Sequence, residues 1–362
     1  MTEVRSAHPF HVYEAIHAQP ERIEKIFTQT AEIERIADAV AAKARITFVG
    51  IGTSLHAARI CESWMQDFTN GQFRAYVEQS FELLHHPPAF GNDDAVIVIT
   101  HTGTSSASVE ALHRARATGA LTVAITGEAC GEGARDADFR IETCEQEKAF
   151  AYTKSYTTAL AALAFLITRV ASTKNLLARA GIERALERLP ELMRDAMRLE
   201  PEAKALAKNL ASLARLEIFG SGVGWATANE AALKIKEACY IAAEGFETEE
   251  ILHGPFSETD SRAALIGLLT ASPSDERARQ IFRAAGELKV FRAAIATAKA
   301  SHGIATEQLL VVPDCDEWLA AFVHLIPLQL LTYFLAIERS TNPDSGRMEQ
   351  TGHSAASRHY KY

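Results

Sequence analysis

Short, continuous apolar runs alternate along the chain with longer segments whose apolar residues recur at helical spacing. The runs predict strands at residues 45–49, 95–100, 121–126 and 139–142 in the first half, and at 216–219, 264–270, 290–296 and 309–312 in the second. Strands that are apolar throughout and separated by helices are typical of parallel sheets covered by helices. We therefore predict an α/β protein with one parallel sheet in each half.

The second half of the chain repeats the first. The stretch ITFVGIGTS at residues 46–54 is echoed by LEIFGSGVG about 170 residues later, and the next strand of each half also ends in a polar turn. Such self-similarity indicates a duplicated structural unit. The domains that we predict are N-terminal helices (1–44), a first subdomain (45–172), a helical connection (173–213), a second subdomain (214–340) and a tail (341–362).

Prolines and glycines predict where helices stop. Gln19-Pro20 should interrupt the first helix, and Pro190 and Pro201 should break the helical connection, because proline lacks the N–H that a helix interior needs. The helix that contains Glu230 should end near Glu244–Gly245, since a glycine commonly follows the last helical residue.

Two predicted strands run into turns that suit an anion. The first is followed by Gly52-Thr53-Ser54 and the second by residues 100–105, THTGTS, and a helix starts after each turn. Free N–H groups and the dipole of a helix N-terminus favour negative charge. One hydroxyl would fit an ordinary N-cap, but four hydroxyls around one glycine favour a phosphate. The first turn is no dinucleotide fingerprint, because Leu55 stands at the third glycine position, and no Walker loop.

A helix in the second half carries charged residues suited to catalysis. Glu230, Lys234 and Glu237 recur at i, i+4 and i+7 and share one helix face, and His253 follows an acidic loop. Such pairs also occur on exposed helices, where each stabilises by roughly 0.2–0.5 kcal/mol. At this point the alternatives are a surface ion-pair network and a cluster for acid–base chemistry.

Composition narrows the classes of partner. The 362-residue chain is 48% hydrophobic and 23% charged, with a net charge of −9 and no basic run, which argues against nucleic acid. Its five cysteines are scattered, so we predict neither a disulfide framework nor a metal site, and we expect no cofactor.

No targeting or membrane segment is predicted. The N-terminus lacks the apolar core of a signal peptide, so we expect a cytoplasmic protein. The apolar run 157–168 is too short to span a bilayer, and 318–337 is interrupted by polar residues. We expect both runs to form buried helices.

The stretch EAALKIKEACYIAAEGFETEEILHGP at 230–255 resembles the isomerase half of glucosamine-6-phosphate synthase and, more widely, the sugar isomerase (SIS) domain family. The resemblance extends over about residues 30–347 and implies two SIS-type subdomains with a flavodoxin-like fold. It further implies that Glu237 transfers the proton, that His253 opens the sugar ring, and that Lys234 is an active-site lysine.

The turn at residues 100–105 is similar to the family's phosphate loop, S-x-S-G-x-T, with His101 where the synthase has Gln. The phosphate-binding residues that the resemblance implies are Ser54, Thr100, His101, Thr102, Gly103 and Ser105. The other substrate contacts that it implies are Gly52, Thr53, Ala151, Tyr152, Thr153 and Arg347. Tyr152 departs from the family's serine, and Thr351 stands where the family has a catalytic lysine, so Lys361 is the candidate to replace that lysine.

Three functions are compatible with these features. The first is an isomerase or deaminase that interconverts an amino-sugar 6-phosphate and a ketose 6-phosphate, such as glucosamine 6-phosphate and fructose 6-phosphate. The second is a deglycase for fructosamine 6-phosphates, and the third is a non-catalytic sugar-phosphate sensor, which Glu237 and His253 disfavour. The synthase's glutaminase domain is missing from the sequence, so glutamine is not expected as the ammonia source. The resemblance also implies a homodimer with shared active sites.

Overall fold

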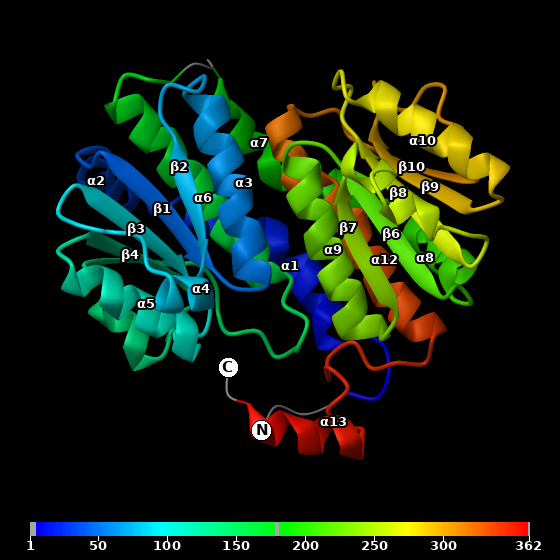
Figure 1. Ribbon diagram of the computed structural model, residues 1–362, viewed down its shortest axis with the longest axis horizontal. Coiled ribbons are helices and arrows are strands. Elements are labelled where there is room, and N and C mark those ends of the chain that lie inside the picture. The colour runs from blue at the N-terminus through cyan, green and yellow to red at the C-terminus, as the bar shows by residue number, and fades with distance from the viewer. Residues whose placement is uncertain (1–4, 178–180, 361–362) are drawn as a thin grey trace. The chain divides into compact units, whose positions relative to one another are not determined.

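The computed structural model describes residues 5–177 and 181–360, and the chain divides into two compact units (Figure 1). Of the described residues, the first unit contains 18–147, 154–177, 181–190 and 355–360. The second contains residues 5–17, 148–153 and 191–354. Each unit has its own parallel sheet, which confirms the predicted α/β class.

The first unit is built on a sheet of order β2-β1-β3-β4-β5. Its strands are β1 (Arg45–Gly50), β2 (Ala75–Gln79), β3 (Asp94–Ile99), β4 (Leu121–Thr126) and β5 (Phe139–Glu142). Its helices are α2 (Thr30–Ala41), α3 (Thr53–Phe68), α4 (Ser80–His85), α5 (Ser106–Ala117) and α6 (Lys154–Thr173), while α1 (His11–Ile26) and α7 (Ile182–Met197) each have residues in both units. Helix α3 packs on β1 and β2, and α5 packs on β3 and β4.

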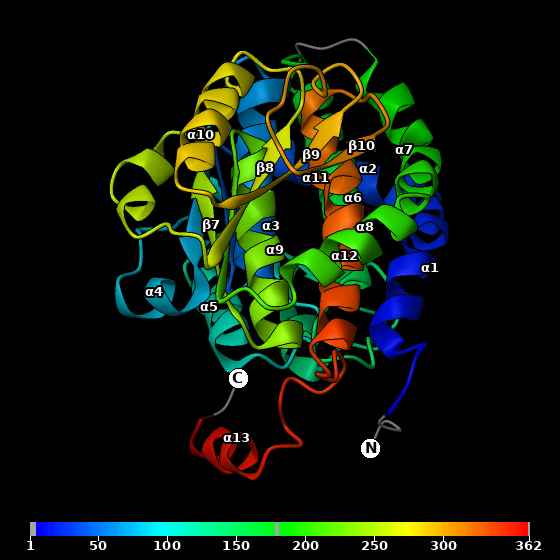
Figure 2. The ribbon, with the colours of Figure 1, turned by 90° about the vertical axis from the view of Figure 1, so that its right-hand side faces the viewer.

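The second unit is built on a sheet of order β10-β9-β8-β6-β7. Its strands are β6 (Arg215–Gly220), β7 (Ala242–Glu247), β8 (Ala263–Leu269), β9 (Phe291–Thr297) and β10 (Gln308–Val312). The helices that follow α7 are α8 (Glu200–Leu210), α9 (Val223–Cys239), α10 (Asp275–Glu287), α11 (Ala320–Val323), α12 (Leu325–Glu338) and the short α13 (Thr351–Ala356). Helix α9 covers β6 and β7, and it lies beside α12 (Figure 2).

The two sheets have the same topology. Read from β7, the second sheet runs β7-β6-β8-β9-β10, so both sheets place their strands in the flavodoxin-like order 2-1-3-4-5. Gly52 and Gly222 precede α3 and α9 with nearly equal backbone angles, φ 56°, ψ −127° and φ 56°, ψ −128°, in a region that glycine alone adopts readily. The predicted duplication is therefore confirmed.

All eight predicted strands are present to within one residue at either end, whereas β2 and β7 were not predicted. Both missed strands lie at the edge of their sheet. Their sequences, AYVEQ and AAEGFE, have only one buried residue each, so they lack the continuous apolar run that marks a central strand.

The helix that carries Glu230 is shorter than predicted. Helix α9 ends at Cys239 because Tyr240 adopts a left-handed conformation (φ 57°, ψ 36°), and the expected continuation to Glu244–Gly245 is strand β7 instead. Gly245 serves close packing: a Cβ atom there would lie 2.4 Å from the backbone nitrogen of Asn229 on α9. The glycine therefore marks contact between strand and helix rather than a helix end.

Two prolines expected to break helices lie inside them. Pro20 is within α1 and Pro190 is within α7, whereas Pro201 is at the start of α8, where no N–H partner is needed. In α1, residues Ile16, Ile23 and Ile26 are fully buried. Their packing outweighs the hydrogen bond that proline removes, so the predicted interruption at Gln19-Pro20 is wrong.

Two helical segments are long and apolar enough to cross a membrane, and both are buried in the fold. In residues 154–173 the most apolar window is 83% buried, and in residues 317–338 it is 94% buried. They are core helices, as expected from the sequence.

Candidate active site

The hydroxyl-rich turns of the first unit lie at neighbouring strand ends. Gly52-Thr53-Ser54 follows β1 and residues 100–105 follow β3, and these two strands are paired in the sheet. From β1 the chain continues to β2 at one edge of the sheet, whereas from β3 it continues to β4 towards the other edge. The two turns therefore flank the topological switch point, which is where α/β proteins bind ligands. The side chains of Ser54, Thr102 and Ser105 are partly exposed, so a ligand can reach them.

The turn at residues 100–105, hereafter called the phosphate loop after the role proposed for it below, is fixed by the loop after β4. Thr100 N donates to Ile125 O (2.9 Å), Gly127 N to His101 O (2.8 Å) and Gly131 N to Thr102 O (2.8 Å). Gly103 has a positive φ of 64°, and a Cβ there would lie 3.1 Å from Gly131 N. The loop is thus shaped before any ligand binds, which lowers the entropy cost of binding.

The His101 side chain of this loop packs against Gly127. A Cβ atom on Gly127 would lie 2.5 Å from Cε1 and 2.7 Å from Nδ1 of the His101 ring, so only glycine leaves room for the imidazole. The Gln146 amide donates to the carbonyl oxygens of His101 and Glu128, both at 3.2 Å. Burial lowers the pKa of His101, against the opposing effect of Glu147. The free protein therefore favours the neutral imidazole.

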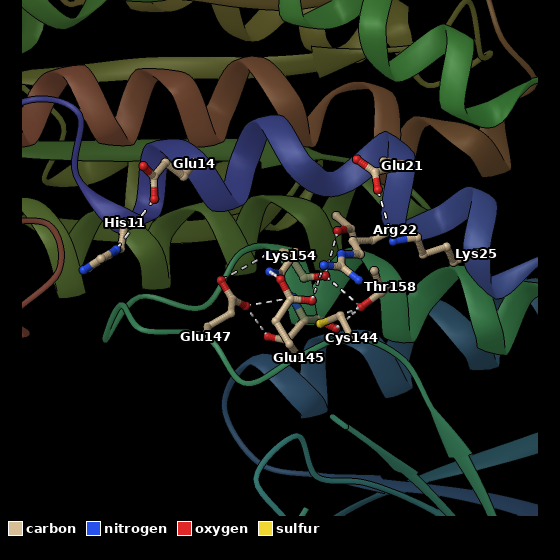
Figure 3. A network of polar contacts seen from close by, with 12 residues as sticks. His11, Glu14, Glu21, Arg22, Lys25, Cys144, Glu145, Glu147, Lys154 and Thr158 are labelled. Atoms are coloured by element: carbon tan, nitrogen blue, oxygen red, sulfur yellow. Dashed lines mark hydrogen bonds and ion pairs between the residues drawn. The ribbon is translucent and has the colours of Figure 1, made fainter. Parts of the chain in front are cut away.

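A charged network follows β5 at the start of α6 (Figure 3). Lys154 is only 6% exposed, and its Nζ lies 2.5 Å from Oε1 of Glu145, which also pairs with Arg22 at 3.1 Å. Burial alone would raise the pKa of Glu145, but the hydrogen bond from Lys154 and the charge of Arg22 hold it below its usual value. Lysines near a helix start are usually solvated, whereas Lys154 is buried with a carboxylate.

Glu147 caps helix α6. Its Oε1 accepts hydrogen bonds from Ser155 N (2.7 Å) and Ser155 Oγ (2.5 Å), and its Oε2 accepts from Lys154 N (3.4 Å). A carboxylate at this end satisfies free N–H groups and complements the helix dipole. Glu147 thereby orients the first turn of α6 and the buried Lys154 with it.

Helix α9 in the second unit carries the candidate catalytic cluster. Lys234 Nζ lies 2.5 Å from Glu237 Oε2 and 3.7 Å from Glu230 Oε1. The Glu230 and Lys234 side chains are 1% and 4% exposed, whereas that of Glu237 is 21% exposed. A surface ion-pair network is therefore excluded, and Glu237 is the member that a substrate can reach.

The tail folds back onto the end of α9. The Arg347 guanidinium lies 4.7 Å from the centre of the Tyr240 ring, and the Tyr240 hydroxyl is 3.0 Å from Ser345 Oγ. Arg347 is thus placed just beyond the last turn of the helix that holds Glu237.

The segment 148–153 packs on the same tail. Phe150 N donates to Asp344 O at 2.9 Å, and the Phe150 ring fills the space that a side chain at Gly346 would need. Ala151 and Thr153 are each 2% exposed, while Tyr152 between them is partly exposed. The second unit therefore brings together the expected substrate segment, Arg347 and α9.

His253 is not brought into this cluster. It follows the 3-10 turn Glu250–Leu252, its side chain is 64% exposed, and its Nε2 lies 3.3 Å from Oε1 of Glu249. Glu249 also pairs with Arg277 at 2.6 Å. Among the described residues the polar contact of His253 is thus to Glu249 and not to Glu237. The other expected catalytic residue, Lys361, lies outside the described residues.

The first unit matches the model of a known protein family. The SIS domain model matches residues 40–169, which include the whole sheet of the first unit and both hydroxyl-rich turns. Residues 40–169 are an SIS domain. The equal strand order of the two units makes the fold a duplicated SIS fold.

Curated relatives match most of this chain. Glutamine–fructose-6-phosphate aminotransferase (isomerizing) of Pyrococcus horikoshii is 29% identical over 335 residues, 92% of this chain and 55% of the relative. The protein of the same name from Legionella pneumophila strain Paris is 30% identical over 311 residues, 83% of this chain and 50% of the relative. The chain thus spans about half the length of the curated relatives it matches.

Solved structures share the duplicated SIS fold over nearly the whole chain. The C-terminal domain of glucosamine-fructose-6-phosphate aminotransferase from Francisella tularensis has a TM-score of 0.87 and 21% identity, covering 94% of this chain and 99% of that one. Tagatose-6-phosphate ketose/aldose isomerase from Escherichia coli has a TM-score of 0.77 and 18% identity, covering 96% and 98%. At these identities the likeness concerns the fold.

The second SIS-type unit has a different loop at its own switch point. The loop after β8 is closed by Asp275, the first residue of α10, whose carboxylate accepts hydrogen bonds from Ala271 N (2.8 Å) and Thr270 N (3.4 Å). Asp275 is 4% exposed. Its carboxylate therefore takes the N–H groups that would otherwise be open to an anion, so the two units are not equivalent for phosphate.

Three features of this geometry were not predicted from the sequence: Gly127, the capping role of Glu147, and Asp275. Asp275 had a recognisable signal, since an aspartate after a polar turn and before a helical pattern is a typical start residue. Gly127 had no recognisable signal in the sequence, because it is needed to leave room for the His101 ring, which is distant in sequence.

Proposed function

We propose that this chain is an SIS-type phosphosugar isomerase or deaminase. The substrate pair that we favour is an amino-sugar 6-phosphate and a ketose 6-phosphate, of the glucosamine 6-phosphate and fructose 6-phosphate type. The observation that carries the proposal is the phosphate loop: a preformed turn with hydroxyls around Gly103, at the switch point of an SIS sheet. Backbone N–H groups, hydroxyl donors and the N-terminus of α5 are together what a phosphate dianion requires.

The reaction that we propose moves one proton between C2 and C1 of the open-chain sugar. A base removes the proton from C2, an enediol or, for an amino sugar, an enamine forms while O1 gains a proton, and the same base delivers a proton to C1. For an amino sugar the product has an imine at C2, which water hydrolyses to the ketose with release of ammonia. Glu237 is the candidate base, because it is the most exposed member of its cluster and Lys234 orients one of its oxygens. The other oxygen is the one that we assign to the substrate.

The remaining roles are proposals of the same kind. We assign ring opening to His253, carbonyl contact to Lys361, and sugar contacts to Gly52, Thr53, Ala151, Tyr152, Thr153 and Arg347. Ser54, Thr100, His101, Thr102, Gly103 and Ser105 are assigned to the phosphate. We further propose a cytoplasmic homodimer in which the two chains share their active sites.

The names of similar proteins support this substrate class. Besides the aminotransferases and the tagatose-6-phosphate isomerase, a glucosamine-6-phosphate deaminase from Thermotoga maritima has the same fold, with a TM-score of 0.75 and 18% identity. These names are those of enzymes that act on phosphorylated sugars.

A deglycase for fructosamine 6-phosphates is the second candidate. The observation that favours it is Tyr152, a large and partly exposed side chain where the family has serine. A tyrosine ring would offer an apolar surface to the amino-acid part of such a substrate.

The deciding experiment offers the protein a panel of phosphorylated amino sugars and fructosamines and measures ammonia and free amino acid. Ammonia from glucosamine 6-phosphate supports the first candidate, and an amino acid from a fructosamine 6-phosphate supports the second. Phosphate-dependent binding without either product would support the sensor and contradict both enzymes. The Glu237→Gln variant distinguishes enzymatic release from spontaneous breakdown.

A further inference from the structure

We infer that His101 couples phosphate binding to the uptake of a proton, being neutral in the free protein and charged when a phosphate dianion occupies the loop. This inference rests on the proposed phosphate-binding function and adds a specific proton to it. His101 is a positioning residue in this scheme, since no direct contact of its ring with phosphate is required.

The geometry ties the imidazole to the loop. His101 stands between Thr100 and Thr102, and its carbonyl is held by Gly127 N and by the Gln146 amide. The ring edge that carries Nδ1 lies directly against Gly127, which has no side chain to displace it. Because His101 is itself a residue of the loop, a charge placed there acts on a ring that is packed against Gly127.

Charged groups of both signs act on the His101 ring. Glu147 and Glu145 favour the imidazolium and Lys154 disfavours it, while burial favours the neutral form. Both carboxylates are already engaged, Glu147 with the start of α6 and Glu145 with Lys154 and Arg22. A phosphate brings about −1.5 to −2 charges to the loop at neutral pH, and this added negative charge favours the imidazolium.

The sign of the linkage follows from this. Burial holds the pKa of His101 below its ordinary value in the free protein, and the bound dianion raises it. Between the two values binding takes up a proton, so phosphate binds more tightly as the pH falls through that window. Below the free-state pKa the imidazole is charged in both states and its contribution to the pH dependence ends.

Calorimetry with fructose 6-phosphate as the probe tests this. Titrations at pH 7 in two buffers of different ionisation enthalpy give the number of protons taken up per phosphate bound. The wild type should take up more protons than His101→Gln, by a difference of up to about one per chain. Protons taken up by the phosphate group of the ligand are the same for the two proteins, so they cancel in the difference. His113→Gln is the matched control, because His113 is an exposed histidine on α5 of the same unit and should leave the number unchanged.

A second measurement observes the ring directly. In protein with labelled histidine, the Cε1–H resonance that His101→Gln removes should move towards the imidazolium position when fructose 6-phosphate is added at pH 7. Equal proton numbers in the wild type and His101→Gln, with binding intact, would overturn the inference and leave the proposed function standing. Absence of binding in the wild type would instead contradict the proposed function.

Discussion

Lys234 Nζ lies 2.5 Å from Oε2 of Glu237, one turn further along α9, and both side chains are largely withdrawn from water. A hydrogen bond to a charged group of this kind holds a carboxylate in one orientation. The second oxygen of Glu237 is not part of this bond, and the side chain is 21% exposed. The pair thus combines a fixed position with access for a substrate.

Replacing Glu237 with Gln should therefore remove catalysis while preserving shape. Turnover of the active sugar phosphate should fall by roughly 10²–10⁴-fold if proton transfer limits the rate, and fructose 6-phosphate affinity should change little. In deuterated water the wild type should exchange the proton beside the substrate carbonyl, and Glu237→Gln should not. Glu244→Gln, an exposed carboxylate on β7, is the control. Exchange that persists in Glu237→Gln would transfer the base role to another residue.

Lys234 should also be needed for stability, because Glu230 is 1% exposed and Lys234 Nζ lies 3.7 Å from it. Lys234→Met leaves that buried carboxylate without its cation, and loss of one partner of a buried pair costs about 3–5 kcal/mol. We expect a corresponding decrease in the free energy of unfolding in urea. The double variant Glu230→Gln, Lys234→Met should be less destabilised than the single one, because the buried charge is gone.

The control for this prediction is an exposed pair in the same unit. Arg283 and Glu276 on α10 lie 3.0 Å apart with side chains 56% and 60% exposed. Arg283→Met should leave the unfolding midpoint unchanged, since exposed pairs contribute little. A double variant that is as unstable as Lys234→Met alone would show that the unpaired charge of Glu230 does not cause the loss in the free energy of unfolding.

The fold was largely predictable from sequence because central strands are apolar throughout. The edge strands β2 and β7 could not be predicted in this way, because most of their residues are only partly buried or exposed and they lack a continuous apolar run. Of the candidate site, the hydroxyl-rich turn at residues 100–105 could be singled out because its residues are contiguous. The burial of Lys154 and the pairing of His253 with Glu249 depend on side chains that the fold brings together, and no local sequence pattern predicts them.

The phosphate loop gives a third prediction, on Thr102. Its hydroxyl oxygen accepts hydrogen bonds from Thr104 N (3.3 Å) and Thr104 Oγ1 (2.9 Å), which keeps it at the partly exposed side of the loop. Thr102→Ala should weaken fructose 6-phosphate binding by about 1.5–3 kcal/mol, the value of a hydrogen bond to a charged group. Thr102→Ser should restore it. Thr118→Ala, at the other end of α5, should have no effect.

The phosphate itself is the second control for Thr102. Binding of unphosphorylated fructose should be weak in every variant and indifferent to the Thr102 change. Equal affinity of the wild type for fructose and fructose 6-phosphate would contradict the assignment of the loop.

The last prediction concerns His253, which we propose opens the sugar ring. Within its own chain it is 64% exposed and bonded to Glu249, on a turn ending at Gly254 with φ 131°. Because His253 is exposed and its polar contact is to Glu249, we propose that it serves the site of a second copy rather than its own Glu237. Chains carrying Glu237→Gln and chains carrying His253→Ala should each be inactive alone. When the two variants are mixed and allowed to exchange subunits, they should form heterodimers with one intact site. Activity should recover to up to about a quarter of the wild-type value, since half of the dimers are mixed and each has one working site of two.

Mixed chains that stay inactive after subunit exchange, shown by a tag on one variant, would mean that each site uses the histidine of its own chain. His302→Ala alone is the control for His253→Ala alone, because this exposed histidine of the same unit should leave activity unchanged.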